Sequence, residues 1–110
     1  MPIMLNQQII ETDSDGYLAN LENWSPAVAE KIAEDLCITL TEEHWEIIYL
    51  LRGFYQTYDL SPAMRPLVKY IREKLGPNKG NSIHLMRLFP ESPARLASKI
   101  AGLPRPENCL

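Results

Sequence analysis

The stretch that decides the fold is TEEHWEIIYLLRGFYQTY, residues 41–58. Its apolar side chains recur at spacings of three and four, which places them along one face of an α-helix. The members of this face are Trp45, Ile48, Leu51, Phe54, Tyr55 and Tyr58. The pattern predicts a helix that begins after Thr41, ends near Tyr58 and forms the centre of the domain.

The tripeptide Ser-Pro-Ala occurs three times, at residues 25–27, 61–63 and 92–94. Serine is a favoured N-cap and proline a favoured first helical residue, so each copy predicts the start of a helix. Together with apolar periodicity, these signals predict further helices over residues 26–36, 62–75, 82–89 and 93–101. Pro66 should delay regular helix in the second of these segments to about Arg65.

Ahead of the first helix, short apolar runs flank the turn signal Asp15-Gly16 within residues 3–18. That dipeptide is typical of a β-hairpin, and we expect a small β ribbon there. The predicted fold is therefore mainly α, of the α+β class, and it is a compact five-helix domain with a small N-terminal β-hairpin. The two helices on either side of the tight turn at Asp59-Leu60 should form a pair similar to a helix-turn-helix.

Length and composition favour one domain in the cytoplasm. The chain has 110 residues, of which 45% are hydrophobic, and we expect a single domain over residues 1–110. The sequence shows no cleavable signal and no apolar run near the roughly 18 residues that a membrane span needs. Cys37, between Leu36 and Ile38, is expected to be a small buried hydrophobe. A disulfide between Cys37 and Cys109 remains an alternative, although the spacing of the two cysteines does not indicate one.

Charge is unevenly distributed along the chain. Residues 1–63 carry 2 basic and 11 acidic side chains, whereas residues 64–110 carry 9 basic and 3 acidic ones, a difference that the net charge of −3 conceals. The basic half either attracts an anionic partner, substrate or RNA, or neutralises the acidic half within the fold. Arg65, Lys69 and Arg72 form a stripe along one predicted helix. This stripe is a solvated face, a docking surface for a partner or, in the helix-turn-helix interpretation, a DNA contact.

Several kinds of chemistry find no support in the sequence. Cys37, His44, His84 and Cys109 lack the paired spacing of metal ligands, and no metal site is expected. His44 is expected to be a solvated residue in the first turn of its helix, and Trp24 a core residue. Catalytic carboxylate pairs, nucleophile elbows and phosphate-binding glycine loops are absent from the sequence, and no cofactor is expected.

After the last predicted helix closes at Gly102, the sequence continues LPRPENCL over residues 103–110. Pro104 and Pro106 fix their own φ and favour extended neighbours, so residues 102–110 are expected to stand off the domain as a flexible arm. Eight extended residues reach at most about 25–29 Å. This arm would carry the thiol of Cys109, a candidate nucleophile, into a cleft of another protein.

Residues 98–110 resemble the C-terminal arm of the DsrC/TusE family of sulfur carriers, whose penultimate cysteine carries a persulfide. Residues 13–18, 43–46, 61–63, 79–82 and 87–90 also resemble that family's pattern, in the same order and across nearly the whole chain. The resemblance implies a mostly helical fold with a small N-terminal β element and a mobile C-terminal arm. It also implies that Cys109 is the catalytic residue.

Ser98 is the one departure from the family's pattern that narrows the function. Family members that serve dissimilatory sulfite reductase have a second arm cysteine at this position, and a serine hydroxyl cannot take part in thiol exchange. What remains resembles the TusE type, a sulfurtransferase that works as a one-cysteine relay. The resemblance implies that it accepts sulfane sulfur from a TusBCD-like complex. It would then pass this sulfur to a tRNA 2-thiouridylase of the MnmA type for wobble uridine thiolation, meeting tRNA only indirectly.

The relay chemistry requires Cys109 as a thiolate, and a free thiol titrates near pH 8.5. Lys99 and Arg105 are expected to supply positive charge when the arm folds back, and the pocket of the partner should supply most of the activation. Gly102, Pro104 and Pro106 would shape the arm. Two alternatives stay open: a sulfur-responsive regulatory or interaction protein that uses the helix-turn-helix-like pair, and a gamma-subunit-like partner of sulfite reductase.

Overall fold

The five predicted helices and the small β-hairpin are confirmed. The structure is a computed structural model that describes residues 2–106. Its elements follow in the order β1 (Ile3–Leu5), β2 (Gln8–Ile10), a 3-10 turn (Leu21–Asn23), α1 (Pro26–Asp35), α2 (Glu42–Tyr58), α3 (Met64–Leu75), α4 (Ser82–Leu88) and α5 (Pro93–Ile100). None of the helices in this part of the chain has the length and apolarity needed to cross a membrane.

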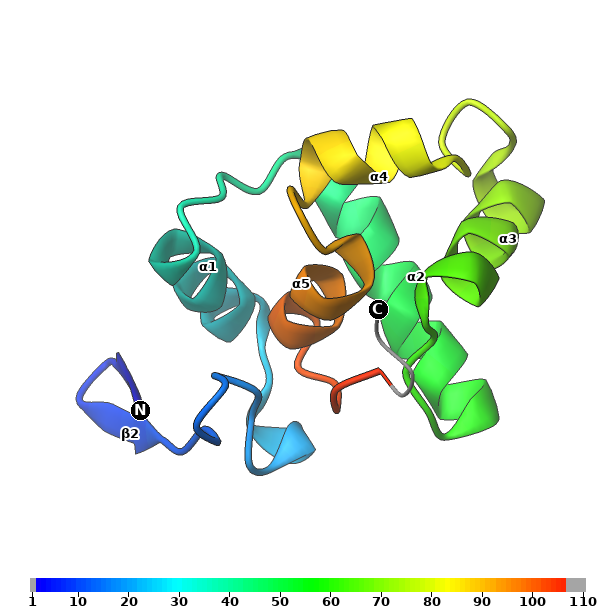
Figure 1. Ribbon diagram of the computed structural model, residues 1–110. Coiled ribbons are helices and arrows are strands. Elements are labelled where there is room, and N and C mark those ends of the chain that lie inside the picture. The colour runs from blue at the N-terminus through cyan, green and yellow to red at the C-terminus, as the bar shows by residue number, and fades with distance from the viewer. Residues whose placement is uncertain (1, 107–110) are drawn as a thin grey trace.

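The helix α5 holds the centre of the molecule. It packs against all four of the other helices, and Figure 1 shows it between α1 and α2 with α4 beside it. Ala97, Ser98 and Ile100 are fully buried, and the small side chains of α5 let its neighbours approach closely because interaxial distance depends on side-chain size. The prediction that residues 41–58 form the central helix is therefore wrong in position. A helix was predicted over residues 93–101, but the sequence pattern of so short a segment did not indicate that it would be buried on several sides.

The helix α2 has the predicted bounds, but its buried face differs from the predicted one. Ile47, Ile48 and Leu51 are almost completely buried, whereas Tyr58 is 55% exposed. Tyr58 lies at the C-terminal end of α2, where its ring meets that of Phe54. The periodicity that predicted Tyr58 as an inward residue continues to the end of the helix, but the core does not.

Two of the three Ser-Pro-Ala tripeptides begin helices as predicted. The Ser25 hydroxyl accepts a hydrogen bond from the Val28 amide at 3.2 Å, and Pro26 is the first residue of α1. Ser92 occupies the N-cap position of α5, again with proline next in the chain. Ser61 does not cap α3, which begins at Met64 after the cap residue Ala63. Pro66 falls in the first turn of α3, where an amide hydrogen is not needed.

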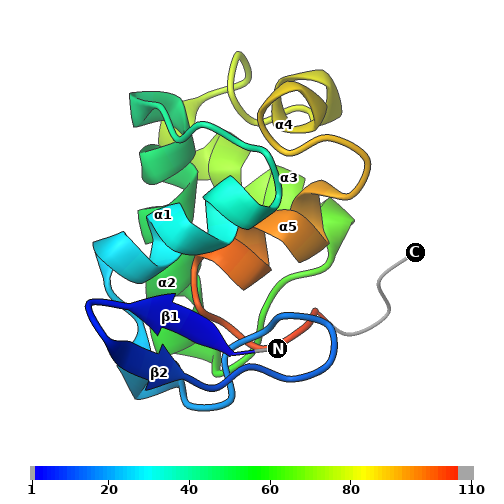
Figure 2. The same cartoon turned by 90° about the vertical axis from the view of Figure 1, so that its left-hand side faces the viewer.

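The N-terminal hairpin uses a different turn from the predicted one. Ile3 pairs with Ile10 across the antiparallel strands β1 and β2, which Figure 2 shows beneath α1. Asn6 and Gln7 connect these strands, both with positive φ, as the favoured two-residue hairpin turns require. The predicted turn at Asp15-Gly16 forms a separate small loop, which an isolated bridge between Thr12 and Leu18 closes.

Cys37 is exposed, which corrects the prediction of a buried residue. The Ile38 amide donates to the Ala33 carbonyl at 2.8 Å and the Cys37 amide to the Glu34 carbonyl at 3.0 Å. This pair of bonds is the Schellman motif that ends many helices, and it puts Cys37 in the left-handed conformation, at φ 61°. The turn reverses the chain direction here, so apolar neighbours in sequence do not enclose the thiol.

Candidate functional site

The predicted sulfur-carrying residue, Cys109, lies outside the described residues. The segment that leads to it, 102–106, is described, and its contacts fix the position of Pro106, the last described residue.

The last turn of α5 is closed by a second Schellman motif. The Leu103 amide donates to the Ser98 carbonyl at 2.9 Å, and the Gly102 amide donates to the Lys99 carbonyl at 3.1 Å. Gly102 has φ 73°, and a Cβ atom built there would lie 2.3 Å from Cδ1 of Trp24. Only glycine therefore fits at residue 102, both for its backbone conformation and for its close approach to the indole.

Trp24 and Arg52 hold the next two carbonyls of the same helix end. The Trp24 indole N–H donates to the Ile100 carbonyl at 2.9 Å, and the Arg52 guanidinium donates to the Ala101 carbonyl at 2.6 Å. The guanidinium carbon lies 3.9 Å from the centroid of the indole ring, so the two side chains support each other. Desolvation by burial lowers the pKa of Arg52 from its ordinary value, but arginine stays charged in proteins. Its positive charge suits the negative end of the α5 dipole.

Residues 102–106 pack against the domain, which corrects the prediction that the arm stands off from Gly102 onward. Leu103 is 3% exposed and Pro106 is fully buried. The Ser61 hydroxyl donates a hydrogen bond to the Pro104 carbonyl at 2.6 Å. Proline rings prevent helix here as predicted, but an extended segment without internal hydrogen bonds can bind side-chain donors of the domain instead.

This packing shortens the distance that Cys109 can travel. Pro106 is the last described residue, and the three residues from it to Cys109 span at most about 10–11 Å. The predicted reach of about 25–29 Å assumed that all eight residues after Gly102 were free of the domain. The packed segment removes most of that reach.

Arg105 and Lys99, predicted to lie near the sulfur, both contact the loop before the first helix. Arg105 forms an ion pair with Asp15, and its guanidinium carbon lies 5.5 Å from the centroid of the Tyr17 ring. The Lys99 ammonium lies 5.2 Å from the same centroid. The Asp13 carboxylate accepts the amides of Asp15 and Tyr17, at 2.9 and 3.0 Å, and so shapes this loop. An exposed ion pair of this kind contributes little to stability.

The structure brings the predicted basic stripe together. Arg65, Lys69 and Arg72 are all exposed on α3, and they line one hollow of about 420 Å³. Arg72 also donates from Nε to the Gly80 carbonyl at 3.1 Å, so its side chain is held in place. Lys99 and Arg105 line a different hollow, of about 460 Å³, together with Arg95. The predicted site residues therefore form two separate basic groups.

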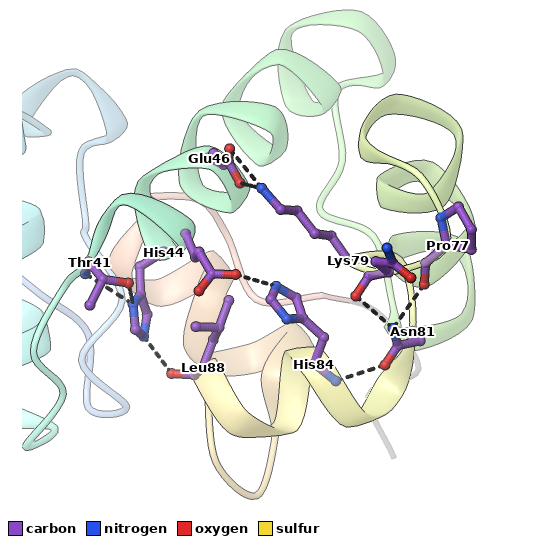
Figure 3. A network of polar contacts seen from close by, with 10 residues as sticks. Thr41, His44, Glu46, Pro77, Lys79, Asn81, His84 and Leu88 are labelled. Carbon is purple, nitrogen blue, oxygen red and sulfur yellow. Dashed lines mark hydrogen bonds and ion pairs between the residues drawn. The ribbon is translucent and has the colours of Figure 1, made fainter.

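The two histidines link α2 to α4, and His44 is not solvated as predicted (Figure 3). His44 is 6% exposed. Its Nδ1 accepts the Thr41 amide at 3.1 Å, so its Nε2 carries the proton that is donated to the Leu88 carbonyl at 2.8 Å. His84 Nε2 lies 3.5 Å from the carboxylate of Glu43. These contacts explain both residues as parts of the packing between helices.

A further contact in the same region joins the loop before α4 to α2 (Figure 3). The Lys79 ammonium lies 2.8 and 3.1 Å from the two carboxylate oxygens of Glu46, and this hydrogen bonding raises the pKa of Lys79. Within residues 2–106 no group of three or more histidine, cysteine or acidic side chains is arranged to hold a metal ion.

A family model described as DsrC like protein matches residues 4–110. The chain belongs to the DsrC family. The resemblance inferred from the tail and the dispersed motifs is thereby confirmed. Curated members of the family include the sulfurtransferase TusE homolog of Haemophilus influenzae, which is 54% identical over 92% of this chain and 93% of its own length. The sulfurtransferase TusE of Photorhabdus laumondii is 51% identical over 98% of this chain and 97% of its own. These names agree with the prediction of a sulfurtransferase.

Solved structures of DsrC proteins confirm the fold. The NMR structure of Allochromatium vinosum DsrC has a TM-score of 0.90 at 45% identity, and all of both chains is covered. The oxidized gamma-subunit of the dissimilatory sulfite reductase, DsrC, from Archaeoglobus fulgidus has a TM-score of 0.87 at 37% identity, again over all of both chains. DsrC-family structures thus share the arrangement of helices around α5.

Sequence reasoning missed the residues that anchor the segment to the domain. Trp24 was expected only as core, and neither Arg52 nor Ser61 was connected with the tail. Ser61, Asp15 and Tyr17 do lie within short motifs that carry the resemblance to the DsrC family, which was the available signal for them. Arg52 had no such signal, because its partner Ala101 is 49 positions away in the sequence.

Proposed function

We propose that this chain is a carrier in a sulfur relay, and that it holds sulfane sulfur as a persulfide on Cys109. The observation that supports this most is the match to proteins named sulfurtransferase TusE at about half identity over more than nine tenths of the chain. Cys109 lies inside the matched residues 4–110. The structure adds that the residues leading to Cys109 are anchored by Trp24, Arg52 and Ser61, which would give the thiol a defined origin on the surface.

The transfer consists of two thiol exchanges without net oxidation. The Cys109 thiolate attacks the terminal sulfur of a persulfide on the donor, a sulfur–sulfur bond forms to Cys109, and the donor leaves as a thiolate. An acceptor thiolate then attacks the outer sulfur on Cys109, takes it as a new persulfide, and releases the Cys109 thiolate. Because a free thiol titrates near pH 8.5, only a minor fraction of Cys109 is ionised at neutral pH unless a partner lowers its pKa.

The donor in this proposal is a TusBCD-like complex, and the acceptor is an MnmA-type tRNA thiouridylase that places the sulfur on the wobble uridine. The relay would operate in the cytoplasm. Residues 1–106 would serve as the body of the carrier and residues 107–110 as the arm that presents the sulfur. Lys99 and Arg105 would fix the direction of the segment through Tyr17 and Asp15. Arg65, Lys69 and Arg72 would belong to the surface that meets a partner.

A second candidate function follows from the likeness to the gamma-subunit of the dissimilatory sulfite reductase of Archaeoglobus fulgidus. Ser98 argues against it. This residue is fully buried, and its hydroxyl has no hydrogen-bond partner among residues 2–106. A hydroxyl at this position cannot form the second half of a disulfide with Cys109. The one-cysteine relay is therefore the function that these observations favour.

The test is intact mass spectrometry after incubation with a cysteine desulfurase and its substrate. We expect one added sulfur atom that maps to the peptide containing Cys109, and none in Cys109→Ser. The matched control is Cys37→Ser, because Cys37 is the exposed cysteine among the described residues, and this variant should load normally. Normal loading of Cys109→Ser would overturn the proposal, provided that circular dichroism shows both variants folded.

A further inference from the structure

The surface beside α4 contains an apolar hollow that the proposed chemistry does not use. Ile83 is 71% exposed and Met86 is 47% exposed, although both are apolar side chains on α4. They line a hollow of about 390 Å³ together with Met64, Ser82, Glu91, Ser92, Pro93 and Ala94. Exposed apolar side chains gathered around a hollow mark surfaces that bind other molecules more often than scattered ones do. Methionine adapts its shape to a partner because its side chain is flexible.

The apolar hollow adjoins the hollow that the basic stripe lines. Met64 and Ser82 line both. The second hollow contains Arg65, Lys69 and Arg72, and its lining, which lies wholly in the described part of the chain, includes no carboxylate. The two hollows therefore form one continuous surface with an apolar part and a basic part. We call the lining residues of both the docking surface.

The docking surface lies next to the segment from which Cys109 extends. Met64 follows Ser61 by three residues, and the Ser61 hydroxyl holds the Pro104 carbonyl at 2.6 Å. Three residues span at most about 11 Å, the two residues from Pro104 to the packed Pro106 span at most about 7 Å, and the three from Pro106 to Cys109 span at most about 11 Å. A macromolecule seated on the docking surface would therefore lie within reach of the sulfur.

We propose that the docking surface binds the acceptor protein of the relay, through an apolar side chain of that protein flanked by acidic residues. This inference rests on the proposed function. The apolar part favours a protein over RNA, because a phosphate backbone would use the basic part and leave Ile83 and Met86 exposed. An apolar anchor in a pocket supplies affinity, while complementary charge around it supplies orientation and a faster encounter. Glu91 lines the apolar part and would repel acidic groups of the partner. These acidic groups would therefore lie against the basic part, on the α3 side.

The test separates loading of the sulfur from its delivery. The carrier is first loaded with a small-molecule persulfide, which needs no docking, and one added sulfur is verified by mass spectrometry. Transfer to the purified acceptor is then followed as a function of acceptor concentration. Ile83→Ser and Lys69→Glu should load as the unaltered protein does, but raise KM at least about tenfold with kcat little changed, as expected for loss of an interface anchor.

Matched controls come from exposed residues away from the docking surface. Ile9→Ser removes an apolar side chain that is 61% exposed on the hairpin, and Lys74→Glu reverses a charge on α3 that does not line either hollow. Both controls should keep KM within about twofold, since surface changes outside an interface have small effects. Normal loading with unchanged KM in Ile83→Ser and Lys69→Glu would overturn the docking proposal alone.

Two other results have different meanings. If the unaltered carrier fails to load at Cys109, the proposed function itself is wrong. If Lys69→Glu weakens transfer only when tRNA is present and Ile83→Ser has no effect, the surface contacts RNA phosphates, and the protein-docking proposal is rejected.

Discussion

Replacing Gly102 with alanine tests how tightly the end of α5 is held. Gly102 has φ 73°, and an added Cβ would lie 2.3 Å from Cδ1 and 2.8 Å from Cβ of Trp24. The left-handed conformation costs alanine about 1–2 kcal/mol, and overpacking against the indole adds about 1–3 kcal/mol. Gly102→Ala should therefore lower the free energy of unfolding by about 2–5 kcal/mol. At about 4 °C for each kcal/mol in a domain of this size, Tm should fall by about 8–20 °C.

The matched control is Gly76→Ala. Gly76 also has a positive φ, 92°, but nothing lies within 4 Å of its added Cβ. Gly76 has ψ 172°, in a region of backbone conformation essentially restricted to glycine, so this variant should lose only the backbone contribution, about 1–3 kcal/mol, or about 4–12 °C in Tm. Urea denaturation and thermal unfolding followed by circular dichroism measure both. If Gly102→Ala is no less stable than Gly76→Ala, the close packing of Trp24 on residue 102 is refuted.

Two further stability predictions concern Cys37 and Arg52. Cys37→Gly should raise the free energy of unfolding by about 0.5–1 kcal/mol, because relief of the left-handed strain exceeds the added entropy of the unfolded chain. Cys37→Ala keeps the strain and should give no gain, and equal stabilities would contradict the Schellman geometry. Arg52→Met should lower the free energy of unfolding by about 1.5–3 kcal/mol in denaturant titration, since it leaves the Ala101 carbonyl unpaired. The exposed Arg65→Met should stay within about 0.5 kcal/mol, and an equal loss in both would contradict the anchor.

Local signals predicted the elements of the fold well. Residues 26–36 and 41–58 were predicted to within a residue, because Ser25-Pro26 and Thr41 supply start signals and the apolar spacing supplies the length. The delayed start of α3 was also predicted, since Pro66 is tolerated only in a first turn. These features depend on interactions among neighbours in the sequence.

Features that depend on distant partners were not predictable in the same way. The Ser61 hydroxyl binds a carbonyl 43 positions away instead of capping α3. His44 is buried because α4 covers it and offers the Leu88 carbonyl, which no pattern near His44 indicates. The packing of 102–106 was missed for the same reason: proline explains why the segment is not helical, but only the folded domain shows what the segment contacts.

Because residues 102–106 are anchored, each transfer of sulfur in the proposed relay would require direct contact between the folded carrier and its acceptor. In the proposed relay, the three residues past Pro106 span at most about 11 Å, so the outer sulfur on Cys109 could pass to the acceptor only while the surfaces of the two proteins are in contact. Choice of acceptor then lies with the folded domain. If the last few residues were grafted onto an unrelated scaffold, the resulting protein would accept sulfur but would not recognise the acceptor. If the helical surface were exchanged instead, the sulfur would go to a different acceptor and the thiol chemistry would stay the same.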